Sequence, residues 1–320
     1  MKKVFGVSFV RVENGNFNAG FDGLARTDFE GNFFATDKAR KYSLRQDFFN
    51  NQKEVLIRKH KTKDGKFESL KGIIESYGLS LKDEKLAQKI FNKFIDVRIF
   101  GAIINQEKNN ILVTTGPCQF LFAKNQFVKD GERMSLQETI DITSFKSGSK
   151  DKAEAMTTIG KQTRVEKAYY MYPFVVNPNI YLNNAKEILG IDYDEEKIKN
   201  LYNEDVNVLK ESIQYDVSEL NSCTKMGCTN FVNIVITMKD EYSNINLATI
   251  QDNMFIEEKI NIENSNIEVS INVENLYSDL LHKKDKIEKI EIYIPETKRF
   301  VIFGLEKLET LGIEIITTRN

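Results

Sequence analysis

Apolar residues that alternate with polar ones predict strands, and apolar residues that recur every three or four positions predict helices. Residues 4–12 are rich in valine and phenylalanine and predict a first strand, which ends at an Asn-Gly pair. After a loop to about residue 35, Thr36 or Asp37 can cap a helix that runs to about Phe49, because a short side-chain oxygen accepts from the free N–H groups of the first turn. Two further helical patterns cover residues 70–77 and 82–94.

The middle and the C-terminal part of the chain predict more strands. The segment FIDVRIFGAII, residues 94–104, alternates like a strand, and the polar NQEKNN that follows predicts a projecting hairpin over residues 99–115. A long polar segment, residues 144–167, precedes a core strand, AYYMYPFVV, and loops of that length are usually functional or mobile. Further strands are expected in GPCQFLFAKNQFV, NFVNIVITM, NIEVSINVE, KIEKIEIYIP and FVIFGLEKLETLGIEII.

This order of elements predicts the α+β class. Strands separated by helices, followed by strands with helical insertions, favour a mixed or antiparallel sheet, for which a ferredoxin-like core fits best. A chain of 320 residues can bury a large core. We expect a single domain over residues 1–320, in which the helical segment 183–220 is an insertion that covers one side.

Charge is distributed unevenly along the chain, although the formal net charge is only -2. From Ala35 to Lys66 ten Lys or Arg stand against four Asp or Glu, whereas from Asn183 to Leu220 four stand against ten. A nucleic-acid site would therefore depend on local charge and not on the total. We expect one positive and one negative face.

Cysteine and histidine predict neither a metal centre nor a catalytic nucleophile. Cys118, Cys223 and Cys228 form no CxxC pair, and the chain has only two histidines, both in polar, lysine-rich surroundings. A disulfide or metal role for Cys223 and Cys228 stays open, although buried, unreactive thiols are the favoured interpretation. We expect no catalytic residue, no metal, no cofactor and a cytoplasmic location.

The sequence is expected to contain neither a targeting signal nor a phosphate loop. The apolar stretch at the start is short and ends at Arg11, and no apolar run is long enough to cross a bilayer, so we expect no membrane partner. Neither GxGxxG nor GxxxxGK[ST] occurs, and about twenty residues separate the first strand from the first helix.

The first predicted helix carries the strongest candidate for chemistry. Lys38, Lys41 and Arg45 share one face, where they could neutralise successive phosphates while glycine and asparagine in the preceding loop let backbone N–H groups approach closely. A charged face that only contacts solvent is an equally good interpretation of this pattern alone.

A family resemblance favours the first interpretation. The chain contains, in this order, ENGNFNAGFDGLARTDFEGNFFATDKARKYSLRQ, DVRIFGA, TGPCQF and MTTIGKQTRVEKAYYMYPF. These motifs cover roughly residues 3–178 and resemble the backbone subunit of type I CRISPR Cascade complexes, the Cas-seven family of the RAMP superfamily, especially its type I-B branch. The C-terminal third is similar only in general character.

The resemblance implies a fold and a function. It implies an RRM-like palm, a helical finger region over residues 50–94 and a projecting thumb hairpin over residues 102–115. It also implies a non-enzymatic scaffold for antiviral defence, whose copies stack as a helical filament along CRISPR RNA. Such a subunit must accept any guide sequence, so it should hold phosphate and 2′-OH groups and leave base edges free.

Site residues follow from the matched motifs. The resemblance implies that the thumb wedges between bases through Ile103 or Ile104. It implies that the RNA-binding residues are Asn18, Arg26, Lys38, Arg40, Lys41, Arg45, Arg98, Gly101, Gln119, Lys161 and Arg164.

The implied partners are the CRISPR RNA (crRNA), the target DNA strand, further copies of this chain and other Cascade subunits. Those subunits are a large subunit, a Cas-five type cap, a Cas-six type processing endonuclease and a small subunit.

Two other functions remain open. Asp22 lies near the position where related type III backbone subunits carry an RNA-cleaving aspartate, so a metal-dependent endoribonuclease is one alternative. A lone carboxylate without a metal partner or a histidine base is a weak catalytic centre. The other alternative is a standalone RNA-binding regulator, which would need the palm but no surfaces for self-stacking.

Overall fold

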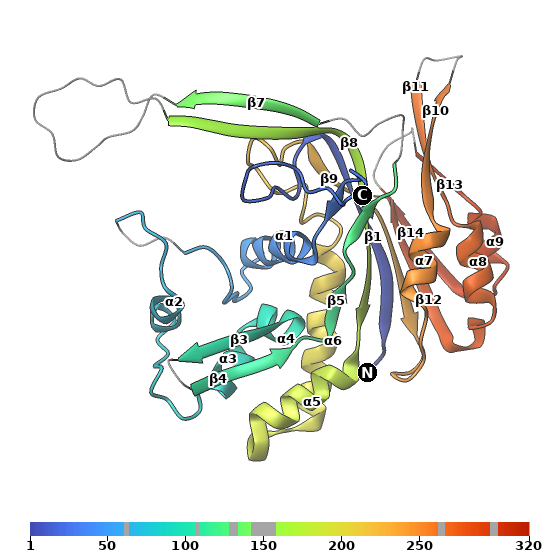
Figure 1. Cartoon of the computed structure of the whole chain (residues 1–320). Coiled ribbons are helices and arrows are strands. Elements are labelled where there is room, and N and C mark those ends of the chain that lie inside the picture. The colour runs from blue at the N-terminus through green and yellow to red at the C-terminus, as the bar shows by residue number, and fades with distance from the viewer. Residues whose placement is uncertain are drawn as a thin grey trace, which may run out of the picture.

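The largest element of the fold is a mixed sheet with β1 at its centre (Figure 1). The computed structural model describes residues 1–60, 64–106, 109–127, 134–141, 158–261, 266–294 and 300–319. β1 is antiparallel to both of its neighbours, β8 and β9. Across the sheet the strands are β14 (Glu314–Arg319), β12 (Ile287–Ile294), β9 (Cys228–Met238), β1 (Val4–Gly15), β8 (Thr158–Val176), β6 (Ala123–Asn125) and β2 (Phe34–Ala35), and β5 (Cys118–Phe120) and β7 (Met134–Asp141) also pair with β8.

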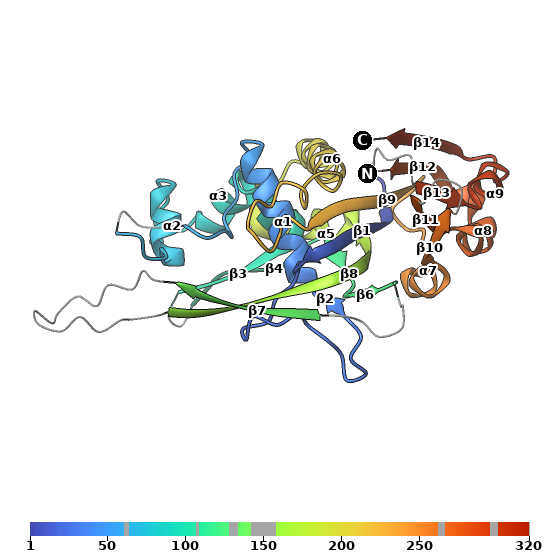
Figure 2. The ribbon, with the colours of Figure 1, turned by 90° about the horizontal axis from the view of Figure 1, so that it is seen from above.

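Both faces of this sheet are covered (Figure 2). Val10 and Val12 of β1 belong to one buried cluster, and Phe5, Val7 and Phe9 belong to a second cluster on the other face. This burial on both sides explains why residues 4–10 of β1 contain only one polar residue, Ser8. The first face is covered by α1 (Asp37–Asn50), α5 (Pro178–Leu189) and α6 (Glu195–Ser212), and a short 3-10 turn (Gly190–Asp192) joins the last two.

The second face carries the C-terminal elements. A small sheet, in which β11 pairs antiparallel with β10 and parallel with β13, packs there with three short helices. The elements are β10 (Phe255–Asn261), β11 (Asn266–Asn272), β13 (Phe300–Phe303), α7 (Leu247–Asn253), α8 (Glu274–Leu281) and α9 (Leu305–Glu309), with a 3-10 turn at Lys284–Lys286.

A third buried cluster lies beside the sheet, and it joins helices to a hairpin (Figure 1). Its members include Ile90 and Phe94 from the helical region and Ile104 and Leu112 from the hairpin. The elements are α2 (Leu70–Ser76), α3 (Leu86–Lys93), α4 (Ile95–Phe100), β3 (Gly101–Gln106) and β4 (Asn109–Thr115).

Most predicted elements are present, but part of the segment 94–104 was predicted wrongly as a strand. Residues 95–100 form helix α4, and all six are buried. Apolar periodicity cannot separate a strand from a helix that is buried on every side. The helix ends where Gly101 adopts φ 77°, a left-handed conformation that glycine favours.

The polar segment 144–167 contains the start of β8, which was not predicted. Residues 158–165 pair with β7 in an antiparallel ribbon that extends away from the main sheet (Figures 1 and 2). Residues 142–157 lie outside the described part of the chain. The element that projects from the sheet in Figure 1 is therefore this ribbon, β7–β8.

The acidic segment 183–220 is part of the main core. Helix α6 has an apolar face on which Ile198, Tyr202, Val206 and Leu209 are buried in the same cluster as β1. Apart from Asp205, which is buried, its acidic residues are exposed on the other face, as in an amphipathic helix at a protein surface.

No helix in the described ranges is both long and apolar enough to cross a membrane.

Candidate nucleic-acid interface

The loop between β1 and α1 is held in a defined shape by distant residues. The Asn16 amide donates to the Thr163 hydroxyl (3.0 Å), which in turn donates to the carbonyl of Gly23 (2.6 Å). The Lys225 ammonium donates to the Asn16 carbonyl (2.9 Å). The loop therefore presents its backbone in a fixed position before α1 begins.

Carboxylates close the two turns at the tip of this loop. Asp22 Oδ1 accepts from the N–H of Leu24 (3.0 Å), and Asp28 Oδ1 accepts from the N–H groups of Glu30 and Asn32, both at 2.9 Å. No group of three or more His, Cys, Asp or Glu that could hold a metal occurs among the described residues. Asp22 therefore has a structural use as a turn-closing acceptor.

Helix α1 begins at the predicted residue but without the predicted side-chain cap. Thr36 occupies the N-cap, yet its hydroxyl donates to Asn18 Oδ1 (3.1 Å) and accepts no N–H of the first turn. The Nδ2 of Asn18 is buried and finds no acceptor within the part of the chain that the structure describes. Asn18 thus joins the loop to the helix and keeps one donor unused.

The cationic face of α1 is present, and its members differ in exposure. Lys38 is exposed. Lys41 is only 12% exposed and forms an ion pair with Asp37 one turn earlier (3.1 Å), and its ammonium donates to Gln119 Oε1 (3.4 Å). The row thus begins at the surface and continues into a partly enclosed site.

Arg45 closes the row beside an aromatic ring. Its Nε lies 3.2 Å from Asp96 Oδ2, and its guanidinium lies 5.2 Å from the centroid of Phe100, which stacks on Phe48. Burial lowers the pKa of Arg45 and the Asp96 carboxylate opposes that change, so the side chain stays charged at neutral pH. Phe100 is buried, so it supports the cations and offers no open face to a base.

Two glycines let the two ends of the hairpin β3–β4 lie close together beside this site. A Cβ on Gly101 would overlap the carbonyl of Thr114, and a Cβ on Gly116 would overlap the backbone of Phe100. Gln119 donates from Nε2 to the Gly116 carbonyl (2.8 Å) while its Oε1 accepts from Lys41. The structure therefore brings Lys41, Gly101 and Gln119 together, although they are far apart in sequence.

Arg40 is a core residue, and its assignment to RNA binding is wrong. Its side chain is fully buried and forms an ion pair with Asp216, which is equally buried. The guanidinium also donates to the Ser8 hydroxyl (2.9 Å) and to the Ile213 carbonyl (3.2 Å). Position 40 lies on the side of α1 that faces the sheet, so no phosphate can reach it.

Arg98 is likewise a structural residue. Its guanidinium donates to both carboxylate oxygens of Asp205 at 2.7 and 2.9 Å, and the Tyr181 hydroxyl donates to the same carboxylate (2.7 Å). Only 7% of Arg98 is exposed. Arg98 joins α4 to α6 directly before the hairpin. Its predicted contact with RNA is wrong, because all three nitrogens of the guanidinium donate to acceptors within the protein.

The remaining predicted cations lie apart from the α1 row. Arg26 is half-buried in the loop, and its Nε has no acceptor in the described ranges. Arg164 lies on β8, where its guanidinium is 3.5 Å from the carbonyl of Asn14 and 3.1 Å from Cys223 Sγ. Lys161 is also on β8, but its side chain lies outside the described residues.

The hairpin β3–β4 has one buried face, so the two residues predicted to wedge between bases differ in their exposure to solvent. Ile103 is 69% exposed, whereas Ile104 is 2% exposed and packs against the helical region. Val113, which pairs with Ile103 across the ribbon, is 57% exposed and was missed. Period-two alternation in both strands could have found this exposed pair. The prediction that Ile104 wedges between bases is therefore wrong, and the hairpin does not project freely.

Ile104→Ala is expected to lower the free energy of unfolding by about 2–4 kcal/mol, because the lost methyl groups leave a cavity in a packed cluster. Ile103→Ala, one residue earlier, should change it by less than about 0.5 kcal/mol. Urea unfolding followed by circular dichroism measures both. Equal effects would contradict the observed orientation of the hairpin.

Asp47 makes stability depend on pH. Burial raises the pKa of its carboxyl to about 6, and hydrogen bonds from Ser212 and Asn51 only partly oppose this. The folded state therefore holds a proton that the unfolded state releases near pH 4, so this group makes the protein less stable as pH rises from about 4 to about 6.

Asp47→Asn is therefore expected to stabilise the protein at pH 7, by at most about 3 kcal/mol, and to have little effect at pH 4. The amide keeps an acceptor for Asn51 and carries no charge to bury. Thermal unfolding across this pH range is the measurement. A variant that is less stable than the parent at pH 7 would show that the Asp47 charge is favourable.

The cysteines offer no reactive pair. All three are free, and burial raises the pKa of the Cys118 and Cys228 thiols to about 12. Cys223 is exposed, so the prediction that it is buried is wrong: it lies on the loop before β9.

Comparisons with known proteins agree with this architecture. Residues 2–278 match the family described as CRISPR-associated protein Cas7. Among solved structures, one titled "CRISPR RNA-guided surveillance complex, pre-nicking" is similar over 97% of this chain and 99% of that chain, with a TM-score of 0.53 and 10% identity. For a second, titled "CRISPR RNA-guided surveillance complex", the match covers 96% of this chain and 98% of that chain, with a TM-score of 0.45 and 9% identity. A search of curated proteins returned no match. Because the family match spans most of the sequence, this chain belongs to the Cas7 family of CRISPR-associated proteins.

Proposed function

We propose that this chain is the RNA-binding backbone subunit of a type I CRISPR surveillance complex, and that it holds the guide RNA by its sugar–phosphate chain. The arrangement at the start of α1 carries the proposal. Lys38, Lys41 and Arg45 form a cationic row next to a fixed loop, and the amide of Asn18 keeps a free donor there. A phosphate or ribose oxygen would satisfy that donor.

The chemistry of this row fits recognition that is independent of sequence. Ammonium and guanidinium groups neutralise phosphates and release counterions, which favours binding to any nucleic acid. The aromatic ring within the row, Phe100, is buried, so it cannot serve as a stacking platform for bases. A guide whose bases must pair with a target is best held in this way.

The order of the strands supports a ferredoxin-like palm. The strands β9, β1, β8 and β5 are neighbours in this order, and each pair is antiparallel. Helix α1 follows β1, and α5 and α6 follow β8, which gives the βαββαβ order of that fold. We assign the helical region from α2 to α4 to the fingers.

The thumb is better assigned to the β7–β8 ribbon than to the β3–β4 hairpin. Half of the β3–β4 hairpin is buried against helices, whereas the ribbon leaves the main sheet, and α1 lies between the two in the view of Figure 1. RNA that follows the cationic row would run between these two antiparallel pairs. Further copies of this chain and other subunits of the complex would contact the parts of the ribbon that extend beyond the sheet.

An endoribonuclease function is less well supported. Asp22 closes a turn, and no metal-binding group was found among the described residues. We expect that the purified protein, incubated with bound RNA and its complement in Mg²⁺ or Mn²⁺, leaves both strands intact on a denaturing gel. Cleavage that Asp22→Asn abolishes would establish the nuclease function instead.

Co-purification tests the proposed function. The protein, expressed together with a CRISPR array, should retain RNA of uniform length, whose sequence varies with the array and not with the protein. One RNA of fixed sequence, bound whatever array is present, would instead identify a standalone regulator.

A further inference from the structure

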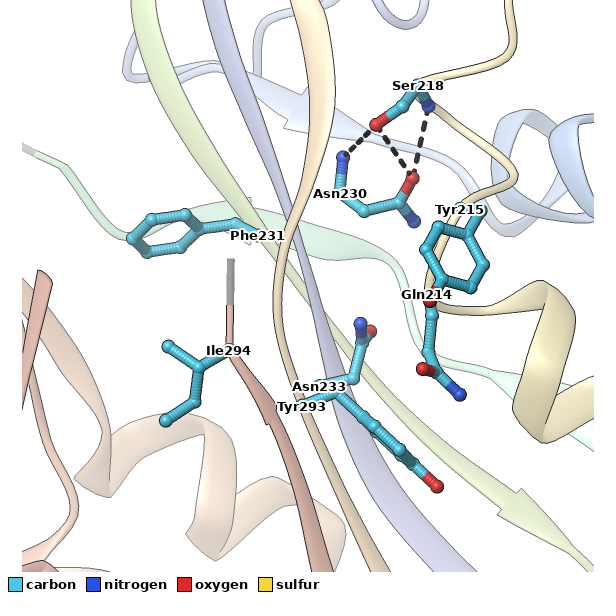
Figure 3. Close-up of a pocket in the computed structure, with 8 residues that line it drawn as sticks. All are labelled: Gln214, Tyr215, Ser218, Asn230, Phe231, Asn233, Tyr293 and Ile294. Atoms are coloured by element: carbon cyan, nitrogen blue, oxygen red, sulfur yellow. Dashed lines mark hydrogen bonds between the residues drawn. The ribbon is translucent and has the colours of Figure 1, made fainter. Parts of the chain in front are cut away.

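A cavity of about 190 Å³ lies beside β9, near the end of β12, and neither the cationic row nor the loop before α1 contributes to it (Figure 3). Its lining comes from the segment after α6 and from β9 and β12. The lining residues are Gln214, Tyr215, Ser218, Asn230, Phe231, Asn233, Tyr293 and Ile294.

The strand pairing explains why a cavity forms there. The β9–β12 ladder ends at the pair Asn233 and Tyr293, so β9 continues past its partner. On the other edge of β9 the register with β1 shifts between Ser8 and Val10. Such an irregularity redirects side chains, and bulges of this kind are frequent beside binding sites.

Asn233 is the unusual residue of this cavity. It is 1% exposed, and its Oδ1 accepts no hydrogen bond from the residues that the structure describes. In Figure 3 its amide points to the side of β9 on which Gln214 and Tyr215 lie. A buried acceptor without a donor costs roughly 1–3 kcal/mol, and such groups are rare in folded proteins.

The neighbouring Asn230 provides a contrast within the same strand. Its Oδ1 accepts from the N–H groups of Val217 and Ser218 at 2.9 and 3.0 Å, and its Nδ2 donates to Ile213 and Asp216 at 2.9 and 2.8 Å. Asn230 is thus fully used in holding the segment after α6. Asn233 has no such structural use, so its acceptor is available to a ligand.

The lining restricts the chemistry of that ligand. None of the eight residues is charged, so a charged group would lose hydration there without a counter-ion. The volume of about 190 Å³ is below the roughly 300 Å³ of pockets for drug-sized ligands, so a single side chain or ring system fits best. Tyr215 and Tyr293 supply aromatic surface on the side of β9 to which the Asn233 amide points. The preferred group is therefore aromatic, neutral and equipped with a hydrogen-bond donor for Asn233.

The surroundings favour a protein over a nucleic acid. The segment that contributes to this cavity, residues 183–220, has ten acidic and four basic residues, of which Asp205 and Asp216 are paired with buried arginines. Glu219, which follows the lining residue Ser218, and Glu211, whose charge acts on Tyr293, are both exposed. Such a field repels phosphates and attracts a cationic segment. We propose that the cavity binds a tryptophan side chain from a positively charged segment of a partner protein, with the indole N–H donating to Asn233 Oδ1. Indole is a donor only, which matches a lone acceptor.

The partner must be a different protein, since this chain contains no tryptophan. The same fact gives a direct assay, because the fluorescence of a tryptophan peptide would be measured against a protein without that fluorophore. The probe is an amidated five-residue peptide with a central tryptophan and flanking lysines. Matched peptides carry 1-methyltryptophan, which lacks the N–H, or flanking glutamates.

We expect the lysine–tryptophan peptide to bind about ten-fold more tightly than the methylated peptide, which is the effect of one hydrogen bond. The glutamate peptide should bind more weakly, and salt should reduce the difference. Asn233→Leu removes the acceptor and leaves no polar group unpaired, so it should bind both lysine peptides equally. Tyr215→Ala changes an exposed residue, so it should weaken the binding of both lysine peptides without unfolding the protein.

Three results would overturn the proposal. They are the absence of saturable binding, equal affinity of the wild-type protein for the indole and methylated peptides, and displacement of the peptide by adenosine at lower concentration than by N-acetyltryptophanamide. The last result would identify a nucleobase pocket. None of these measurements involves RNA bound at α1, so they are independent of the proposed function.

Discussion

Arg40→Ala is expected to lower the free energy of unfolding by about 3–5 kcal/mol, because it leaves the carboxylate of Asp216 buried without its partner. Both side chains are fully buried, and the guanidinium also donates to Ser8 and Ile213. Chemical denaturation of the protein without RNA measures the effect. This is the largest loss of stability that we expect from a single substitution in α1.

Two controls make this result specific. Lys38→Ala, two residues earlier and exposed, should change stability by less than about 0.5 kcal/mol. Arg40→Met combined with Asp216→Asn removes both charges and keeps an acceptor for Asn230, so it should recover at least half of the loss. A stable Arg40→Ala protein with weakened RNA binding would restore Arg40 to the interface and contradict the structure.

The double substitution Lys38→Gln and Lys41→Gln is expected to weaken RNA binding at low salt by a similar factor for unrelated sequences. The slope of log K against log salt should fall by about one unit for each lost phosphate contact. Fluorescence anisotropy with two labelled RNAs over a salt series measures this. Arg45 is left unchanged, because its removal would also leave the buried Asp96 carboxylate without its cationic partner.

Helix α6 offers a matched control for that experiment. Lys197 is exposed, and Lys199 forms an ion pair with Glu195 one turn earlier, just as Lys41 does with Asp37. Lys197→Gln with Lys199→Gln therefore removes the same number of charges, including one with an ion pair to the preceding turn, from a helix outside the proposed site. This control should bind RNA as the parent does. Equal loss in both double variants would mean that only net charge matters, and a loss confined to one RNA would mean that bases are read.

The sequence was sufficient where an end of the element carries a clear signal, such as the Asn-Gly pair after the first strand or Thr36 and Asp37 at the start of the first helix. The strand at residues 4–12 and the helix at residues 37–49 were predicted within a few residues of β1 and α1. The segment 95–100 was not, because a helix that is buried all round shows no amphipathic period. The start of β8 was missed because its polar residues belong to a ribbon that leaves the core, where apolar alternation is not required.

The candidate site was predictable in position but not in detail. Residues at spacing 38, 41 and 45 share a face in any helix, and the structure keeps them together. The predictions for Arg40 and Arg98 failed because the sequence does not reveal their buried partners. Asp216 and Asp205 lie more than a hundred residues away along the chain. Asn233 shows the same limit, since an unpaired amide is visible only once every neighbour is placed.

The dependence of assembly mass on RNA length tests the central claim most directly. A backbone subunit that follows the sugar–phosphate chain should add copies in proportion to length, whatever the sequence. We therefore predict that mass photometry of the protein with unrelated RNAs of one, two and three times a given length shows a stepwise, linear increase in bound copies. A constant number of copies at every length, or binding confined to one sequence, would contradict the account.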